Sequence, residues 1–319
     1  MYVYILALLA SFFLVYLLIP LAKRFAWKIR LLDMPTGRKA HGRPMPLSGG
    51  IAMFTGIAFI LLLFARDEPL IWVLIVGGAL LIGIGTVDDW FKANQMEFPV
   101  SPKLIVQIMV AVMAFLMNIR FQGMNLSLFA DQADIVEFPV WLSFVATVLW
   151  IVGLINMVNF LDGADGLAGG VVTLSATTMF FISFVKQQSL TAMIAIVIVG
   201  GTLAFLRFNF YPAQVFMGDA GSTFLGYALA IVSLEGLMKG ATLISLFVTI
   251  LALGVPVMDT LQVMISRLLA GKPMYQADRR HMHHRLMSKG LTAKQTVVVL
   301  YIISIIFSAV SLWLFLYVV

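Results

Sequence analysis

Long apolar runs recur along the chain, and short polar loops separate them. A membrane core of about 30 Å requires roughly 20 apolar residues in a helix, and ten runs approach or exceed that length. Since lipid offers the backbone no hydrogen-bond partners, continuous runs of this kind form helices. We therefore predict an all-α, polytopic membrane protein in a single domain, 1–319. The predicted spans are 2–22, 47–65, 69–87, 104–119, 138–158, 168–185, 188–206, 220–238, 240–259 and 295–318.

The composition agrees with this pattern. Apolar residues make up 61% of the chain and charged residues 11%, against about 25% charged in soluble domains. The chain has no cysteine, which excludes disulfides and cysteine-based metal sites. The net charge of +6 does not indicate nucleic-acid binding, because the positive residues lie in short loops between apolar runs.

The distribution of lysine and arginine predicts the orientation. Ten spans place both termini on one side, and 17 of the 21 basic residues fall on the other. These lie in 23–46, 88–103 and 261–294 and at Arg207. By the positive-inside rule that face is cytoplasmic, so both termini are extracytoplasmic. On the opposite face, the alternation in loop 120–137 predicts a small hairpin.

Acidic residues gather at the predicted cytoplasmic ends of several spans. Ionisable groups at membrane depth are costly and usually functional. Their shared depth predicts an active site at the cytoplasmic rim. The residues are Asp88, Asp89, Asp162, Asp165, Asp219 and Asp259.

Asp88 and Asp89 are adjacent at the end of the third run. Two neighbouring carboxylates in a low dielectric repel, so a cation or a shared proton should accompany them. Lys92, four residues after Asp88, is a candidate partner. The alternative is a charged helix end that faces lipid headgroups.

Residues 156–166 read N-M-V-N-F-L-D-G-A-D-G. Asn156, Asn159, Asp162 and Asp165 recur every three residues, a spacing that drifts about 60° per step around a helix. We therefore expect the helix to break here, with glycines allowing the backbone close to a ligand. The alternative is a turn that caps the next helix at Gly166, which leaves the two asparagines unexplained.

Residues 208–222, F-N-F-Y-P-A-Q-V-F-M-G-D-A-G-S, place Asp219 in a turn that opens a helix. Backbone N–H groups at a helix start favour anions. Magnesium prefers carboxylate oxygens and takes substrate phosphates as further ligands. Phe216 offers a flat face to a base, or alternatively faces lipid.

Histidines and arginines cluster in a later loop. Zinc is disfavoured there because neighbouring arginines repel a metal, whereas such cations suit phosphate oxygens. An ordinary basic cytoplasmic loop would explain the arginines but not the histidines. The cluster contains Arg279, Arg280, His281, His283, His284 and Arg285, and residues 38–50 have a similar basic, glycine-rich character.

Five motifs in this order resemble the polyprenyl-phosphate N-acetylhexosamine-1-phosphate transferases of glycosyltransferase family 4. They are R-K-A-H…P-M-P-L-S-G-G, D-D-W-F-K, N-x-x-N-F-L-D-G-A-D-G, the 208–222 segment and D-R-R-H-M-H-H-R-L. The resemblance implies a bacterial cytoplasmic membrane enzyme in which undecaprenyl phosphate attacks the β-phosphate of a UDP-N-acetylhexosamine and releases UMP. It also implies dependence on Mg²⁺, with Mn²⁺ as a substitute, and a homodimer.

The resemblance also implies roles for individual residues. It marks Asp219 and Asp89 as metal ligands and Asp88, Asp89 and Asp162 as catalytic. Asp165 and Phe216 match positions near uracil, and Asn209 a site-lining amide. Phosphate-side lysines match Lys39, Lys92 and Lys103, and the sugar-diphosphate motif matches His281, His283 and His284. Asn156, Asn159 and Arg279 complete the predicted substrate-binding set.

The sequence His-Met-His-His-Arg differs from the three consecutive histidines followed by an acid in the peptidoglycan branch. This difference favours the branch that uses UDP-GlcNAc and begins teichoic acid, O-antigen or common-antigen linkers. A phospho-N-acetylmuramoyl-pentapeptide transferase is the alternative within the family. An ion-coupled transporter and a non-catalytic lipid-binding scaffold are alternatives of other classes, although transporters keep their acids near the bilayer centre.

Overall fold

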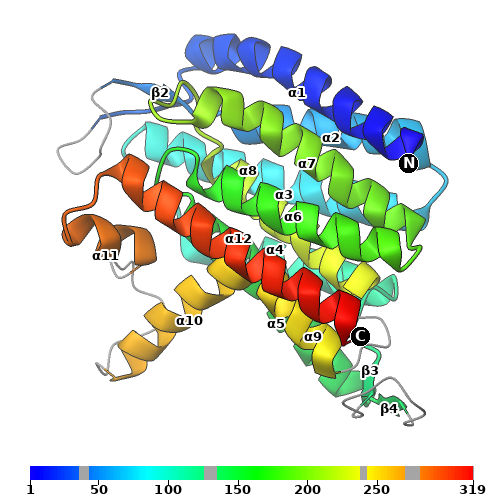
Figure 1. Cartoon of the computed structure of the whole chain (residues 1–319). Helices are drawn as coiled ribbons and strands as arrows, with labels where there is room; N and C mark the ends of the chain where they lie inside the picture. The colour runs from blue at the N-terminus through cyan, green and yellow to red at the C-terminus, as the bar shows by residue number, and fades with distance from the viewer. Residues whose placement is uncertain (36–42, 126–134, 238–242, 270–280, 319) are drawn as a thin grey trace.

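The computed structural model describes residues 1–35, 43–125, 135–237, 243–269 and 281–318. Most of its helices lie side by side in one bundle, and α10 leads away from the others (Figure 1). Both chain termini and the β3–β4 hairpin are at one end of the bundle, and β2 and α11 are at the other (Figure 1). The arrangement therefore gives the bundle two distinct ends, one of which carries the predicted site.

The helices follow the apolar runs of the sequence. Within the described residues, six helices are long and apolar enough to cross a membrane, and the bent pair α9–α10 would make a seventh. This confirms an all-α, multi-pass membrane architecture. The helices are α1 Tyr2–Ile29, α2 Gly49–Ala65, α3 Pro69–Ala93, α4 Val100–Leu116, α5 Val140–Leu161, α6 Leu167–Val185, α7 Ser189–Asn209, α8 Gly218–Val232 with a π-helical end Ser233–Leu237, α9 Leu243–Ala252, α10 Gly254–Leu269, α11 Met282–Ser288 and α12 Ala293–Tyr317.

Two short antiparallel hairpins accompany the helices. Strand β1, Leu32–Asp33, pairs with β2, Met45–Pro46. Strand β3, Gly123–Asn125, pairs with β4, Ile135–Glu137, as the alternation in loop 120–137 predicts.

The predicted ninth span, 240–259, is not one helix. Helices α9 and α10 meet at 86°, and the break falls at Leu253, while α10 continues to Leu269. Pro256 lies in the first turn of α10, where its missing N–H costs no hydrogen bond. The proline therefore fits the first turn of a second helix, just after the sharp bend that divides the predicted span.

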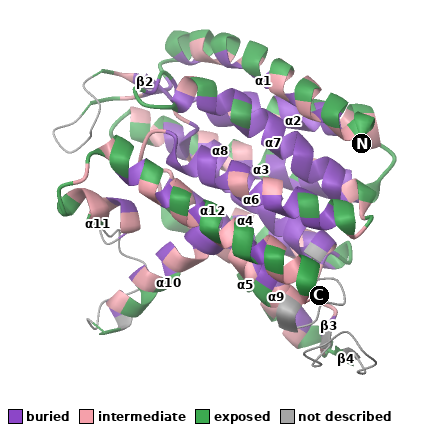
Figure 2. Ribbon diagram, viewed as in Figure 1, coloured by how far each residue is buried: buried purple, intermediate pink, exposed green. Residues whose placement is uncertain are grey.

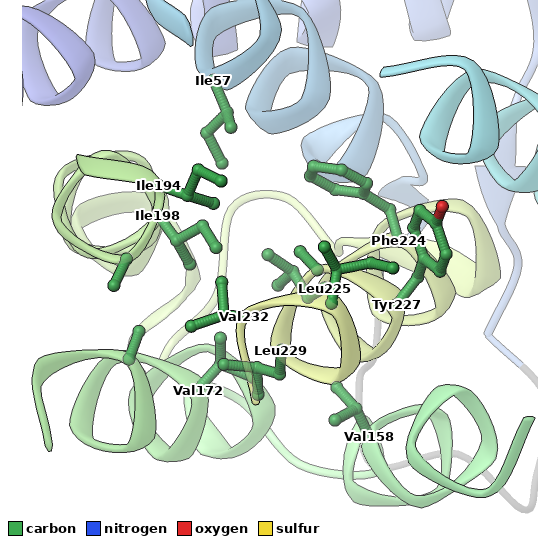
Figure 3. Close-up of a cluster of buried hydrophobic side chains, with 14 of the residues drawn as sticks. Ile57, Val158, Val172, Ile194, Ile198, Phe224, Leu225, Tyr227, Leu229 and Val232 are labelled. Carbon is green, nitrogen blue, oxygen red and sulfur yellow. The ribbon is translucent and has the colours of Figure 1, made fainter. Parts of the chain in front are cut away.

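Helix α8 lies at the centre of the bundle. Buried residues are concentrated in the middle of the bundle, including α6 and α7 (Figure 2). In Figure 3, Phe224, Leu225 and Leu229 of α8 point toward side chains of neighbouring helices, such as Val158 and Ile194. Every residue of α8 is buried except Asp219. The one polar group left accessible on this helix therefore lies at its N-terminal end.

Small residues let the backbone of α8 approach α2 and α3. A Cβ added to Gly50 would lie 2.3 Å from Gly221, and one added to Gly85 would lie 2.5 Å from Ala220. Backbones come this close in membrane helices only where small residues face each other. Glycine in α2 and α3 therefore sets the depth and rotation of α8.

We expect Gly85→Ala to lower the thermal unfolding midpoint of the protein in detergent, because the new methyl group meets the α8 backbone. Overpacking of this kind costs about 1–3 kcal/mol. Gly83→Ala is the matched control, since a Cβ at Gly83 meets nothing within 4 Å. Equal midpoints for the two variants would contradict the close approach of α3 and α8.

Candidate active site

A cavity of about 1000 Å³ is lined in part by α11 residues, His284 and Met287. The ends of α3, α5 and α7 and the start of α8 contribute its walls. Residues far apart in the sequence therefore meet here, as the shared depth of the acids predicts. The predicted site residues that line the cavity are Asp89, Lys92, Asp162, Asp165, Asn209, Phe216, Asp219 and His284.

Two lysines bridge two carboxylates beside this cavity, which Lys92 and Asp219 line. Lys92 Nζ lies 2.9 Å from Asp88 Oδ2 and 2.6 Å from Asp219 Oδ1. Lys103 Nζ lies 3.1 Å from Asp88 Oδ2 and 3.3 Å from Asp219 Oδ2. The predicted pairing of Lys92 with Asp88 is confirmed, and this four-residue lysine–aspartate cluster joins α3, α4 and α8.

Asp89 has a different environment from Asp88. Its carboxylate accepts hydrogen bonds from the backbone N–H groups of Asp219, at 2.9 Å, and Ala220, at 3.3 Å. An acidic group at a helix N-terminus satisfies free N–H groups and complements the helix dipole. Gly218, with φ +69°, allows the approach, because an added Cβ would lie 2.3 Å from Asp89 Oδ2. Asp89 therefore fixes the start of α8 and the position of Asp219.

The predicted helix break is present, since α5 ends at Leu161 and α6 begins at Leu167. We call residues 162–166 the aspartate loop. Gly166, with φ +80°, is the N-cap residue of α6, and no side chain caps this helix start, so the capping alternative is not what the structure shows. Asn209 Oδ1 accepts a hydrogen bond from Gly166 N, and Asp165 Oδ2 accepts one from Ala213 N. These contacts attach the aspartate loop to the segment after α7.

Asp162 follows the last residue of α5 and lines the cavity. Burial, together with the charge of Asp219, raises the pKa of its carboxyl from 3.8 to about 7, because a buried acid favours its neutral form. Asp162 can therefore gain or lose a proton near neutral pH.

Asn156 and Asn159 do not line the cavity. Asn156 Nδ2 donates to Gln107 Oε1 at 2.7 Å, and Asn159 Nδ2 donates to Ser222 Oγ at 2.8 Å. These amides therefore connect α5 to α4 and α8, and their hydrogen bonds are structural contacts between helices.

The three histidines have different environments. His284 lines the cavity. His281 Nδ1 lies 2.7 Å from Asp259 Oδ2, and both residues are buried. His283 is buried against Gly163, and burial lowers the pKa of its ring to about 4, so it is neutral at neutral pH. The predicted residues Lys39 and Arg279 lie outside the described part of the chain.

Several lining residues were not among the predicted site residues. Asp33 and Arg43 lie on or near the β1–β2 hairpin, and Arg43 Nη2 donates to Ala213 O at 3.1 Å. Phe216 pairs with Leu47 beside the same hairpin. Most of these additional lining residues lie within the five sequence motifs, which could therefore have identified them. The additional lining residues are Asp33, Arg43, Met45, Leu47, Gly163, Ala164, Tyr211, Pro212, Ala213, Gly218, Met287 and Ala293.

The donor set suits a hard cation that is completed by substrate. Among the described residues, no three His, Asp or Glu side chains form a metal site by themselves. Asp162 and Asp219 nevertheless line one cavity, and lysine ammonium groups lie between Asp88 and Asp219. Magnesium commonly uses one or two carboxylates, waters and substrate phosphates, which these residues fit.

Comparison with known proteins agrees with this geometry. The sequence pattern of Glycosyl transferase family 4 matches residues 71–237. A probable undecaprenyl-phosphate N-acetylglucosaminyl 1-phosphate transferase of Bacillus subtilis (strain 168) is 35% identical, over 99% of this chain and 88% of that protein. The chain belongs to glycosyl transferase family 4.

Two further similar proteins of the family have related descriptions. The undecaprenyl-phosphate alpha-N-acetylglucosaminyl 1-phosphate transferase of Salmonella typhi is 29% identical, over 95% of this chain and 82% of that protein. The decaprenyl-phosphate N-acetylglucosaminephosphotransferase of Mycobacterium tuberculosis (strain H37Rv) is 28% identical, over 88% of this chain and 74% of that protein. The family resemblance stated from the five motifs is confirmed.

The raised pKa of Asp162 predicts a pH-dependent stability. The folded protein keeps the Asp162 proton up to about pH 7, whereas the unfolded chain loses it near pH 4. The folded state therefore loses stability as pH rises between these values. Without divalent ions, we expect the thermal unfolding midpoint of Asp162→Asn, relative to that of the wild type, to be higher at pH 7.5 than at pH 5.

Asp67→Asn is the control for this measurement, because the Asp67 side chain is 93% exposed. Its midpoint should follow the wild type at both pH values. A constant difference between Asp162→Asn and the wild type would contradict the retained proton.

Proposed function

We propose that this protein transfers N-acetylglucosamine 1-phosphate from UDP-GlcNAc to undecaprenyl phosphate, giving undecaprenyl-diphosphate-GlcNAc and UMP. The decisive observation is the lysine–aspartate cluster, of which Lys92 and Asp219 line a large cavity at one end of a membrane bundle. A soluble nucleotide and a lipid phosphate can both reach such a place. The family relatives, described as GlcNAc 1-phosphate transferases, support the sugar.

The cluster provides the electrostatic part of the reaction. Phosphoryl transfer depends mainly on positioning and on neutralising phosphate charge. Lys92 and Lys103 hold Asp88 and Asp219 together, and their ammonium groups attract incoming phosphate oxygens. Asp89 holds Asp219 in place through the first turn of α8.

Magnesium is the proposed cofactor, with Mn²⁺ as a substitute. Asp219 is the first carboxylate to hold it, with Asp89 and Asp162 nearby on the cavity wall. When bound, the ion would neutralise charge on the diphosphate. The hydrogen bonds from Asp219 N and Ala220 N to Asp89 give Asp89 a positioning role in the same site.

The reaction we favour is direct attack. An oxygen of the lipid phosphate forms a bond to the β-phosphorus of UDP-GlcNAc. The bond from that phosphorus to the bridging oxygen breaks, and UMP leaves with that oxygen. Asp162, with its pKa near 7, is suited to hold or release a proton beside these phosphates, because proton transfer is most effective near the working pH.

The nucleotide end of the donor is proposed to occupy the side of the cavity formed by the segment after α7. Asp165 is held there by Ala213 N, and Phe216 lies in the wall with a ring face for uracil. His284, from α11, also lines the cavity and offers a donor to the diphosphate.

We further propose ten membrane crossings with both termini extracytoplasmic, in the bacterial cytoplasmic membrane. The six long helices and the bent pair account for seven. The shorter apolar helices α2 and α4 and α8 with its π-helical end supply the rest. The positive-inside bias of the sequence supports the placement of the site in the cytoplasm.

The alternatives differ in substrate or class. A muramoyl-pentapeptide donor remains the second candidate within the family, and the GlcNAc relatives disfavour it. A transporter is disfavoured because the acids gather at one end of the bundle. The homodimer stays a prediction from the family resemblance.

Purified protein should release UMP from UDP-GlcNAc only when undecaprenyl phosphate and Mg²⁺ are both present. Asp219→Asn should lose at least about 100-fold in turnover, because it weakens the metal site. Radiolabelled UDP-GlcNAc separates lipid product from free nucleotide.

The same assay is run with UDP-N-acetylmuramoyl-pentapeptide as the donor and, separately, with EDTA to remove the divalent ion. Turnover with the pentapeptide donor but not with UDP-GlcNAc would show that the proposed sugar is wrong. No UMP from either donor would overturn the transferase assignment, and undiminished turnover in Asp219→Asn would remove Asp219 as the ligand.

The cysteine-free sequence allows a direct test of topology. Single substitutions Ser288→Cys on α11 and Glu137→Cys on β4 lie at exposed positions at opposite ends of the bundle. In intact cells an impermeant maleimide should label the cysteine at 137 and reach the one at 288 only after permeabilisation. The reverse result would place the site outside the cell.

A further inference from the structure

We propose that Tyr301 of α12 is a positioning residue that holds the aspartate loop in its donor-binding shape, an inference that rests on the proposed function. The Tyr301 hydroxyl donates a hydrogen bond of 2.5 Å to Gly166 O. Tyr301 does not line the cavity, and it acts through the loop that carries Asp162 and Asp165.

The peptide groups of Gly166 are held from two sides. Asn209 Oδ1, at the end of α7, accepts from Gly166 N at 2.9 Å, and Tyr301, from α12, donates to Gly166 O. Gly166 is in the left-handed region at φ +80°, where the backbone is not held by regular helix geometry. Two separate helices therefore fix the residue at which the aspartate loop becomes α6.

The Tyr301 ring is positioned by its own contacts. A Cβ on Gly170 would lie 1.9 Å from the Tyr301 hydroxyl oxygen, so the ring rests directly against the α6 backbone. The ring of Phe210 is 6.5 Å away, edge to face. The hydroxyl is therefore held in one place, and its hydrogen bond is directional.

This contact also ties the loop to the part of the cavity wall formed by α11 and the start of α12. Ala293, the first residue of α12, lines the cavity, as do Met287 and His284 of the preceding α11. Tyr301 lies two turns further along α12. The same hydrogen bond therefore sets the distance between the aspartate loop and the wall that carries His284.

Loss of the hydroxyl would loosen one side of this arrangement. Gly166 O would keep its helical hydrogen bond from Gly170 N, at 3.0 Å, so α6 itself should stay folded. The aspartate loop, with Asp165 hydrogen-bonded to Ala213 N, would be free to shift. The effect should therefore fall on binding of the nucleotide sugar, since the lysine–aspartate cluster lies on other helices.

Tyr301→Phe keeps the ring and removes only the hydroxyl. In the UMP-release assay we expect its KM for UDP-GlcNAc to rise about 5-fold to 10-fold, the loss of roughly one hydrogen bond. The KM for undecaprenyl phosphate should stay within about 2-fold of wild type. Tyr317→Phe, on the same helix and 76% exposed, is the matched control and should match the wild type.

Amide hydrogen exchange supplies a readout that needs no turnover. Peptides that span residues 162–167 should exchange faster in Tyr301→Phe than in Tyr317→Phe. If the wild type releases no UMP, the proposed function fails, and this exchange result still decides the role of Tyr301.

Two results would overturn the proposal. One is an unchanged donor KM with unchanged exchange at 162–167. The other is a lower kcat with both KM values unchanged, which indicates only a smaller folded fraction. If Tyr301→Phe does not purify as a folded protein, Gly170→Ala displaces the same ring from the other side and should give the same donor-specific rise in KM.

Discussion

The hydrogen bonds from the first turn of α8 to Asp89 are the contact on which the site depends. Helix α8 is buried at every residue except Asp219, so its free N–H groups have little access to water. Asp89 satisfies two of them. It thereby places Asp219 within reach of Lys92 and Lys103. The geometry of the lysine–aspartate cluster therefore depends on this contact between α3 and the first turn of α8.

The rest of the fold supports that junction. Gly50 and Gly85 let α2 and α3 approach the α8 backbone, and Asn159 connects α5 to the same helix through Ser222. Close packing of small residues and a few internal hydrogen bonds hold membrane helices together, because apolar side chains gain no hydrophobic free energy by leaving lipid. The chemistry at the rim is therefore set by packing deep in the bundle.

Much of the fold could be predicted from the sequence, because apolar run length and glycine-rich breaks directly reflect how a chain folds in lipid. The apolar runs predicted the helices, and the D-G-A-D-G stretch predicted the break after α5. Other features depend on tertiary contacts that no local pattern reveals. The burial of His281 beside Asp259, the hydrogen bonds of Asp89 and the place of Arg43 beside Ala213 belong to this class. The break at Leu253, which divides the predicted span 240–259, also belongs to this class, and Pro256 lies in the first turn of the helix that follows.

The paired lysines have a consequence for the resting protein. Each ammonium group lies between two carboxylates, so the acids carry internal counter-ions of their own. A site built this way need not rely on an external ion to keep its acidic side chains from repelling one another. The scaffold can therefore persist between catalytic cycles, whatever the momentary supply of divalent salt.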